Sequence, residues 1–278
     1  MNIAIIGLGV IGGSFAMGLQ AAGYKNVFGV DINLETIELA EKEGFIRKGV
    51  VDAKDILSDM DVILLSLYPS QIAPFVTQHK ALFKTGVVLT DVTGVKTEII
   101  KQVTTVLPET ADFIFAHPMR GSEKKGIIGA DHTRFVGANA LITPVPINKE
   151  ENLQLIEQLY KEIGFEQVTR VSPELHDEQI AYVSQLMHAL SVAVVNSSQA
   201  SDETLTFAGN SFQELTRIAD INGELWSELF LNNRQDLLKS IHTFETELDK
   251  LKQTLAEDDK ESLKEIFSRA ATQRRKWY

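Results

Sequence analysis

The sequence predicts an α/β fold in two parts, an N-terminal doubly wound sheet followed by an all-helical C-terminal domain. Three observations predict it. Short apolar runs alternate with helical patterns up to about residue 170, a glycine-rich turn follows the first run, and strand-like alternation stops after Pro173. Alternating strands and helices are typical of a parallel sheet covered on both faces. We therefore expect one domain over residues 1–170 and a second over residues 171–278.

The N-terminal part holds apolar runs of strand length with helical patterns between them. The expected strands are Asn2–Ile6, Asn26–Val30, Val62–Ser66, Val87–Thr90, Phe113–Ala116, Ala138–Thr143 and Glu166–Arg170. The expected helices include Gly12–Ala22, Leu34–Glu43 and Asn148–Ile163.

A long helix is expected to open the C-terminal domain. Ser172 is a good N-cap, and Pro173 suits the first helical turn. Apolar residues then recur at helical spacing, which predicts a helix from about Glu174 to Ala200 among four or more helices. Because this helix is richly apolar, we expect part of its surface to pack against a second copy in a homodimer; the alternative is a central helix within one monomer.

Composition narrows the functional classes. The 278 residues carry a formal net charge of −11 and include no cysteine. Such an acidic chain is a poor candidate for binding nucleic acid or an anionic membrane, and no apolar run is long enough for a transmembrane helix. The N-terminus has the pattern of a strand rather than a signal peptide, which predicts a cytoplasmic protein. The histidines show no metal-ligand spacing, so no metal is expected.

A glycine-rich turn predicts the cofactor. Residues 7–12 read Gly-Leu-Gly-Val-Ile-Gly, directly after a predicted strand and at the start of a predicted helix. This is the context of the dinucleotide fingerprint in a Rossmann domain, where the glycines allow a tight turn, close approach of a pyrophosphate and helix-on-strand packing. The competing interpretation is a similar turn in a domain that binds no nucleotide.

Asp31 favours NAD among the dinucleotides. It ends the second predicted strand, where a carboxylate can bind both hydroxyls of the adenosine ribose and would repel a 2′-phosphate. NAD is therefore favoured over NADP, with FAD as the remaining competitor. The predicted cofactor-binding residues are Gly7, Leu8, Gly9, Val10, Ile11, Gly12, Asp31 and Ser66.

Two histidines are candidates for acid–base chemistry. His117 ends a predicted strand, and ligands of parallel sheets bind beyond the carboxyl ends of the strands. His188 lies one turn after Ser184 on the long helix, so that both project from one face. Each histidine, taken alone, also fits a structural role. The others are interpreted as surface residues (His79, His132 and His242) or as a capping or packing residue (His176).

A cation is available in the helical domain. Arg217 offers a planar fork that matches a carboxylate, although a surface pair with Glu214 or Asp220 explains it equally well.

These stretches together resemble the prephenate/arogenate dehydrogenase family. The matching segments are GLGVIGGS at 7–14, HPMRGSEKKG at 117–126, VSQLMH at 183–188, and LTRIA with a following Trp at 215–226. They cover nearly the whole chain in the right order. The resemblance implies oxidative decarboxylation of prephenate to 4-hydroxyphenylpyruvate with NAD+, in tyrosine biosynthesis. The alternative within the family is arogenate, which would give tyrosine directly.

The resemblance also implies roles for individual residues. It makes His117 the base for the ring hydroxyl, Arg217 the clamp for a substrate carboxylate, and Ser184 with His188 the groups that orient the substrate. Glu123 matches a glutamate near the mouth of the pocket. A tryptophan that matches Trp226 reaches the site from a partner subunit, which would make dimerisation functional.

Two departures from the family pattern stand out. The family has a serine in Asp-x-Gly-Ser-x-Lys, but residues 91–96 read Asp-Val-Thr-Gly-Val-Lys, with Gly94 at the serine position. Thr93 could supply a hydroxyl from the adjacent position, although in another direction. Arg120 stands where the family has a small residue; it could contact a second carboxylate or point to solvent.

Two other classes remain open from the residues. A two-domain enzyme of the 3-hydroxyacid dehydrogenase or imine reductase type would place a lysine in the helical domain, but none occurs between Lys161 and Lys239. A non-catalytic NAD-binding module would bind the cofactor without turnover.

Overall fold

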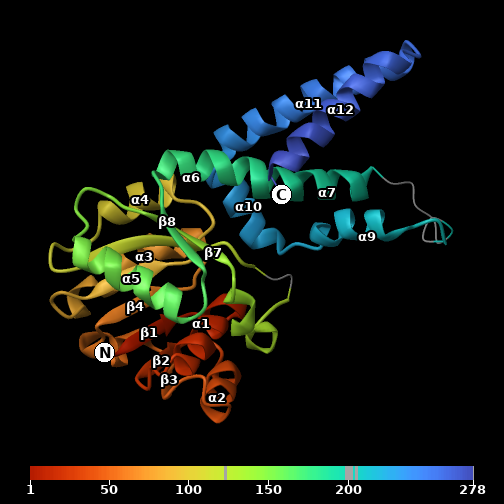
Figure 1. The fold of residues 1–278 in the computed structure, drawn as a ribbon. Coiled ribbons are helices and arrows are strands. Elements are labelled where there is room, and N and C mark those ends of the chain that lie inside the picture. Colours follow the sequence, from red (N-terminus) through yellow and green to blue (C-terminus); the bar gives the residue numbers. More distant parts are fainter. Residues whose placement is uncertain (122–123, 198–202, 204–205, 278) are drawn as a thin grey trace.

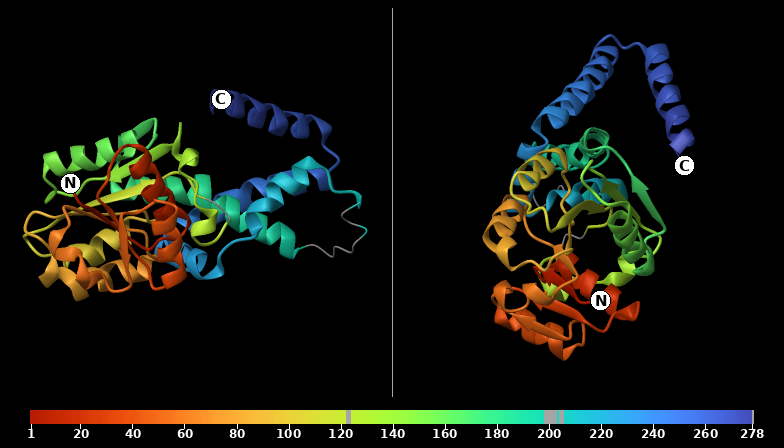
Figure 2. Two further views of the ribbon diagram at one scale, coloured as in Figure 1. Left: turned by 90° about the horizontal axis from the view of Figure 1, so that it is seen from below. Right: turned by 90° about the vertical axis from the view of Figure 1, so that its left-hand side faces the viewer.

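The chain forms a sheet domain and a helical domain that meet along one side (Figure 1). A computed structural model describes residues 1–121, 124–197, 203 and 206–277. The helical domain begins directly after the last strand, and its final two helices project as a hairpin. Figure 2 shows these two helices diverging from their connecting turn. This architecture confirms the expected α/β fold with an all-helical C-terminal part.

One eight-stranded sheet runs through the N-terminal part, in the order β3-β2-β1-β4-β5-β6-β7-β8. The strands are β1 (Ile3–Ile6), β2 (Val27–Val30), β3 (Lys48–Val50), β4 (Val62–Leu65), β5 (Val88–Asp91), β6 (Asp112–Pro118), β7 (Asn139–Thr143) and β8 (Gln167–Arg170). Strand β3 was not expected from the sequence. It is short, polar at its start and only partly buried at the sheet edge, so it lacks an apolar run.

The sheet is not wholly parallel, which corrects the expectation. Strand β7 runs antiparallel to β6, while all other neighbours are parallel. A parallel pair needs a crossover, usually a helix, to return the chain to the same end of the sheet. Between β6 and β7 the described chain instead has short 3-10 turns, at Ile127–Gly129 and His132–Phe135.

Helices cover both faces of the sheet. They are α1 (Val10–Ala21), α2 (Leu34–Lys42) and α5 (Glu150–Glu162) on one face, and α3 (Pro69–His79) and α4 (Thr97–Thr104) on the other. Alternate residues of a strand point to opposite faces. Ile3 and Ile5 accordingly pack with α1, and Ala4 and Ile6 belong to the core under α3 and α4.

The C-terminal part is helical throughout its described residues. Its elements are α6 (Pro173–Ile180), a π-helical turn (Ala181–Gln185), α7 (Leu186–Asn196), α9 (Asn210–Thr216), a 3-10 turn (Arg217–Ala219), α10 (Gly223–Asn232), α11 (Arg234–Ala256) and α12 (Lys260–Trp277). The first three form one long rod, as expected, with Ser172 as its side-chain N-cap. None of the described helices combines the length and apolar character that a membrane span requires.

The apolar stripe of this rod, which consists of Ile180, Val183, Met187, Leu190 and Val194, is only partly covered within one chain. Ile180 is buried, but Val183 is 53% exposed and Met187 is 37% exposed. The interior side of the rod instead carries Ala181 and Gln185. The helical periodicity was therefore correct, and part of the stripe is left uncovered within one chain.

Candidate active site

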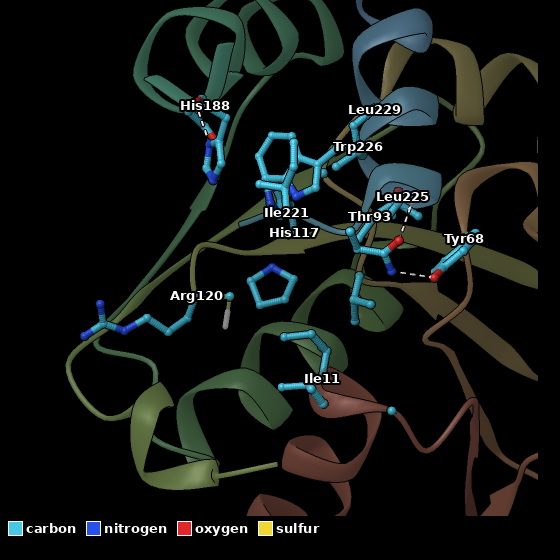
Figure 3. Close-up of a pocket in the computed structure, with 18 of the residues that line it drawn as sticks. Ile11, Tyr68, Thr93, His117, Arg120, His188, Ile221, Leu225, Trp226 and Leu229 are labelled. Carbon is cyan, nitrogen blue, oxygen red and sulfur yellow. Dashed lines mark hydrogen bonds between the residues drawn. The ribbon is translucent and has the colours of Figure 1, made fainter. Parts of the chain in front are cut away.

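A cleft of about 1120 Å³ lies between the carboxyl ends of the strands and the helical domain. Parallel sheets bind ligands at this edge, beyond the ends of their strands. The cleft brings together most of the side chains that the sequence singled out, from segments far apart in the chain (Figure 3). They are Ser66, Thr93, His117, Arg120, Ser184, His188, Arg217 and Trp226, together with Gly9, Val10 and Ile11 of the glycine turn. Glu123 lies outside the described residues.

The glycine turn joins β1 to α1 at the floor of the cleft. Gly7 has a φ of +90°, and a Cβ there would stand 2.4 Å from the Ser66 carbonyl oxygen. A Cβ on Gly12 would stand 1.9 Å from the Gly7 oxygen, so only glycine lets this helix approach. A Cβ on Gly9 would meet no protein atom within 4 Å, which leaves room in the cleft beside the start of the helix.

Asp31 directly follows β2 and is held by two backbone hydrogen bonds. Its carboxylate accepts hydrogen bonds from the backbone N–H of Leu8 at 2.8 Å and of Asn33 at 2.9 Å. Leu8 is itself buried, so its contribution to this region is a backbone donor rather than a side chain. These bonds fix the carboxylate next to the glycine turn, where the ribose of a dinucleotide is held in Rossmann domains.

His117 is the penultimate residue of β6 and lines the cleft. Its Nε2 lies beside Gly94: a Cβ on that glycine would be 3.6 Å away. Burial lowers the pKa of His117 well below its usual 6.5, with smaller contributions from the charges of His176 and Lys96. The imidazole is therefore neutral at neutral pH and can accept a proton.

His188 and Trp226 form the opposite wall. Their rings lie 3.7 Å apart between centroids at an interplanar angle of 31°. The Nδ1 of His188 bonds to the Ser184 carbonyl oxygen at 3.0 Å, within the rod where the π turn meets α7. A carbonyl can only accept, so Nδ1 carries the proton. Trp226 lines the cleft of its own chain, and the contribution of a tryptophan from a partner subunit stays a prediction.

The two arginines are placed differently. Arg217 lines the cleft from the 3-10 turn between α9 and α10, on the helical side. Arg120 also borders the cleft, but its side chain extends away from His117, His188 and Trp226 (Figure 3). Its Nε donates to the Arg134 carbonyl oxygen at 3.1 Å. Of the two alternatives for Arg120, this arrangement favours the outward one.

Thr93 does not replace the missing serine. Its hydroxyl donates to the Asp91 carboxylate and receives a hydrogen bond from Lys96 Nζ at 3.1 Å. The hydroxyl is thus bound beneath the cleft wall and is not directed at His117, which corrects the catalytic role suggested for it. Gly94 stands at the position of the family serine, where a Cβ would lie 3.4 Å from Leu229 Cδ2 and 3.6 Å from His117 Nε2.

The structure adds two groups that the sequence had not assigned to the site. His176 is buried, and its Nε2 lies 2.9 Å from His117 Nδ1. The adjacent Asp177 is buried as well and bonds the other ring nitrogen of His176. One signal was available: His176 lies four residues before Ile180, so the buried side of α6 extends back to it. His79, expected at the surface, is also buried.

Two family models match the chain. "Prephenate dehydrogenase, nucleotide-binding domain" matches residues 15–169, and "Prephenate dehydrogenase, dimerization domain" matches residues 172–269.

The chain is similar to known proteins over nearly its full length. Prephenate dehydrogenase from Bacillus subtilis is 27% identical over 97% of this chain and 74% of that protein. Prephenate dehydrogenase from Aquifex aeolicus, solved in complex with hydroxyphenyl propionate and NAD+, has a TM-score of 0.91 and 28% identity, covering 100% of this chain and 98% of that one. Arogenate dehydrogenase from Synechocystis has a TM-score of 0.83 and 25% identity, with full coverage of both chains.

Proposed function

The chain belongs to the prephenate dehydrogenase family, and from this premise we propose that it oxidises prephenate to 4-hydroxyphenylpyruvate with NAD+. One observation carries the proposal. His117 at the end of the sheet and Arg217 on the helical side line the same cleft as the glycine turn. A neutral base, a cation for a carboxylate and a nucleotide turn are the groups that this reaction requires.

The chain's own residues fit a bound dinucleotide. The turn at 7–12 would hold the pyrophosphate at the start of α1, and Asp31 would hold the ribose hydroxyls. The open space beside Gly9 supports this assignment, as does the orientation of Asp31 by two backbone donors. When bound, NAD+ supplies the hydride acceptor.

The proposed reaction balances in protons and electrons. His117 takes the proton of the ring hydroxyl while hydride leaves the same carbon with its electron pair, so that a carbonyl forms. The bond from the ring to its carboxylate then breaks, and its electron pair makes the ring aromatic as carbon dioxide leaves. The ring oxygen recovers a proton from His117. No proton is released overall, so His117 needs only to hold one during the cycle.

The two domains have different roles in this proposal. Residues 1–170 would hold the cofactor and the base, and residues 171–278 would hold the substrate and the partner subunit. On the helical side, Arg217 would bind a carboxylate, and His188 would offer its bare Nε2 to the substrate. A net charge of −11 makes such local placement of cations and donors necessary for an anionic substrate.

Arg217→Ala is expected to raise KM for prephenate about 10- to 100-fold with a smaller effect on kcat, since a hydrogen bond to a charged group is lost. Steady-state kinetics at saturating NAD+ would measure it. Arg120→Ala is the matched control, because that guanidinium is directed away from the cleft centre, and its KM should change little. An unaltered KM in Arg217→Ala would remove Arg217 from the substrate site.

The proposed function is tested by following reduced cofactor with prephenate and arogenate offered separately, each with NAD+ and with NADP+. We expect the highest kcat/KM for prephenate with NAD+. Turnover of arogenate alone would make the enzyme an arogenate dehydrogenase. A preference for NADP+ would show that Asp31 does not meet the ribose, and cofactor binding without turnover of either substrate would reject the enzyme altogether.

We also propose that the chain works as a homodimer. The description of the C-terminal family model supports this, as do the exposed apolar side chains Val183, Met187 and Val195 on the rod. A second copy is the symmetric way to cover such a face. Sedimentation equilibrium is expected to give twice the chain mass of 30.9 kDa. A species of the chain mass at micromolar concentration would contradict the dimer.

A further inference from the structure

A row of three side chains, the relay, leads from the cleft into the protein. His117 Nδ1 lies 2.9 Å from His176 Nε2, and His176 Nδ1 lies 2.7 Å from Asp177 Oδ1. His176 is 1% exposed and Asp177 is 2% exposed, so water does not compete for these contacts. The row joins the end of β6 to α6, the first helix of the other domain.

The inner end of the row is fixed by backbone donors. Asp177 accepts hydrogen bonds from the N–H of Lys96 at 2.9 Å and of Thr97 at 2.8 Å, at the start of α4. Although burial raises the pKa of Asp177, the bonds from His176 and Thr97 outweigh it and leave the pKa below its ordinary value. Asp177 is therefore an ionised, accept-only group that cannot move without breaking these bonds.

The position of each proton follows from that carboxylate. Because Asp177 can only accept, His176 must carry a proton on Nδ1. Burial lowers the pKa of His176, opposed by its bond to Asp177, so the ring is neutral and its Nε2 is bare. A bare Nε2 requires His117 to donate from Nδ1. The Nε2 of His117, beside Gly94 in the cleft, is then left without a proton.

We propose that His176 and Asp177 are positioning residues, which hold His117 in the tautomer whose bare Nε2 faces the substrate and compensate the charge that it gains. Without His176, a buried Nδ1–H would lack its acceptor, and the ring would lose its preference for this tautomer. Once His117 is protonated, its positive charge points along the row toward the Asp177 carboxylate. The inference rests on the proposed role of His117 as the base.

The tautomer can be measured in the wild-type protein without turnover. In 15N-histidine NMR of the full chain, His117 is expected to show a protonated Nδ1 and an unprotonated Nε2, and its signals are identified by their loss in His117→Asn. A proton on Nε2 of His117 in the resting protein would overturn the relay. This result is independent of whether prephenate is the substrate, so the failure of the relay and the failure of the proposed function are distinguishable.

Two variants at one position separate positioning from packing. His176→Leu is expected to lower kcat about 10- to 100-fold with little change in KM, because the base loses its orienting acceptor. His176→Gln keeps a donor and an acceptor and is expected to recover most of the lost kcat. The matched control is His79→Leu, another buried histidine, whose Nδ1 bonds the Phe75 carbonyl oxygen in its own helix.

The kcat and the stability of these variants show whether His176 positions His117. If His79→Leu loses stability without loss of kcat while His176→Leu loses kcat, the relay is supported. If His176→Leu keeps the wild-type kcat, His176 does not orient the base. If His176→Leu fails to fold, the wild-type tautomer and the kcat of His176→Gln still give the answer: an inactive, folded His176→Gln variant with normal tautomers would also overturn the relay.

Discussion

Replacing His117 by asparagine is expected to lower kcat by at least about 100-fold, the contribution of a well-placed general base. Asparagine has a similar size but cannot take up a proton at neutral pH. Affinity for NAD+ should be retained, because the glycine turn and Asp31 lie on other elements. Steady-state assays of prephenate turnover measure the loss of kcat, and titration of NAD+ binding measures the affinity separately.

The control for this variant is His242→Asn, an exposed histidine on α11 that should keep full activity. The pH profile of the wild type gives a second check. Burial lowers the pKa of His117 below 6.5, so the base is neutral above that value and is lost as the pH falls through the lowered pKa. The acid limb of kcat/KM should accordingly lie below pH 6.5. A near-normal kcat in His117→Asn would remove His117 as the base.

Lys96→Met is expected to destabilise the protein by about 3–5 kcal/mol, because it leaves the buried Asp91 carboxylate without its counter-charge. Both side chains are 0% exposed, and Lys96 Nζ lies 2.7 Å from Asp91 Oδ2. The ammonium also donates to the Thr93 carbonyl oxygen at 2.9 Å. The free energy of unfolding in urea, followed by fluorescence, measures the loss.

The matched control is Lys239→Met, since Lys239 pairs with Glu178 at 3.3 Å on the surface. An exposed pair contributes at most about 1 kcal/mol, so this variant should unfold close to the wild type. The Lys96 pair lies directly under the cleft wall at Thr93 and Gly94, and activity should fall together with stability. Equal unfolding midpoints for the two variants would show that the buried pair contributes no more than a surface one.

Local patterns in the sequence predicted most of the fold. Apolar runs of strand length, helical spacing and Ser172-Pro173 set the main elements of both parts, because hydrophobic periodicity and capping act within a few residues. The glycine turn and Asp31 were predicted in the same way, because both belong to one strand–helix–strand unit, in which their spacing along the chain is fixed. The place of His117 followed from its position at the end of a strand.

Other features depended on contacts between segments that are distant in the sequence, and local patterns do not predict such contacts. Strand β7 runs antiparallel to β6, because the described part of the chain between them has no crossover helix, and β3 forms by pairing at an edge. The Thr93 hydroxyl forms hydrogen bonds with Asp91 and Lys96 instead of with His117. The meeting of His117 with His176, 59 residues apart, needed the helical domain to dock on the sheet. The sequence by itself determined which chemical groups were available, while tertiary packing decided which of them touch.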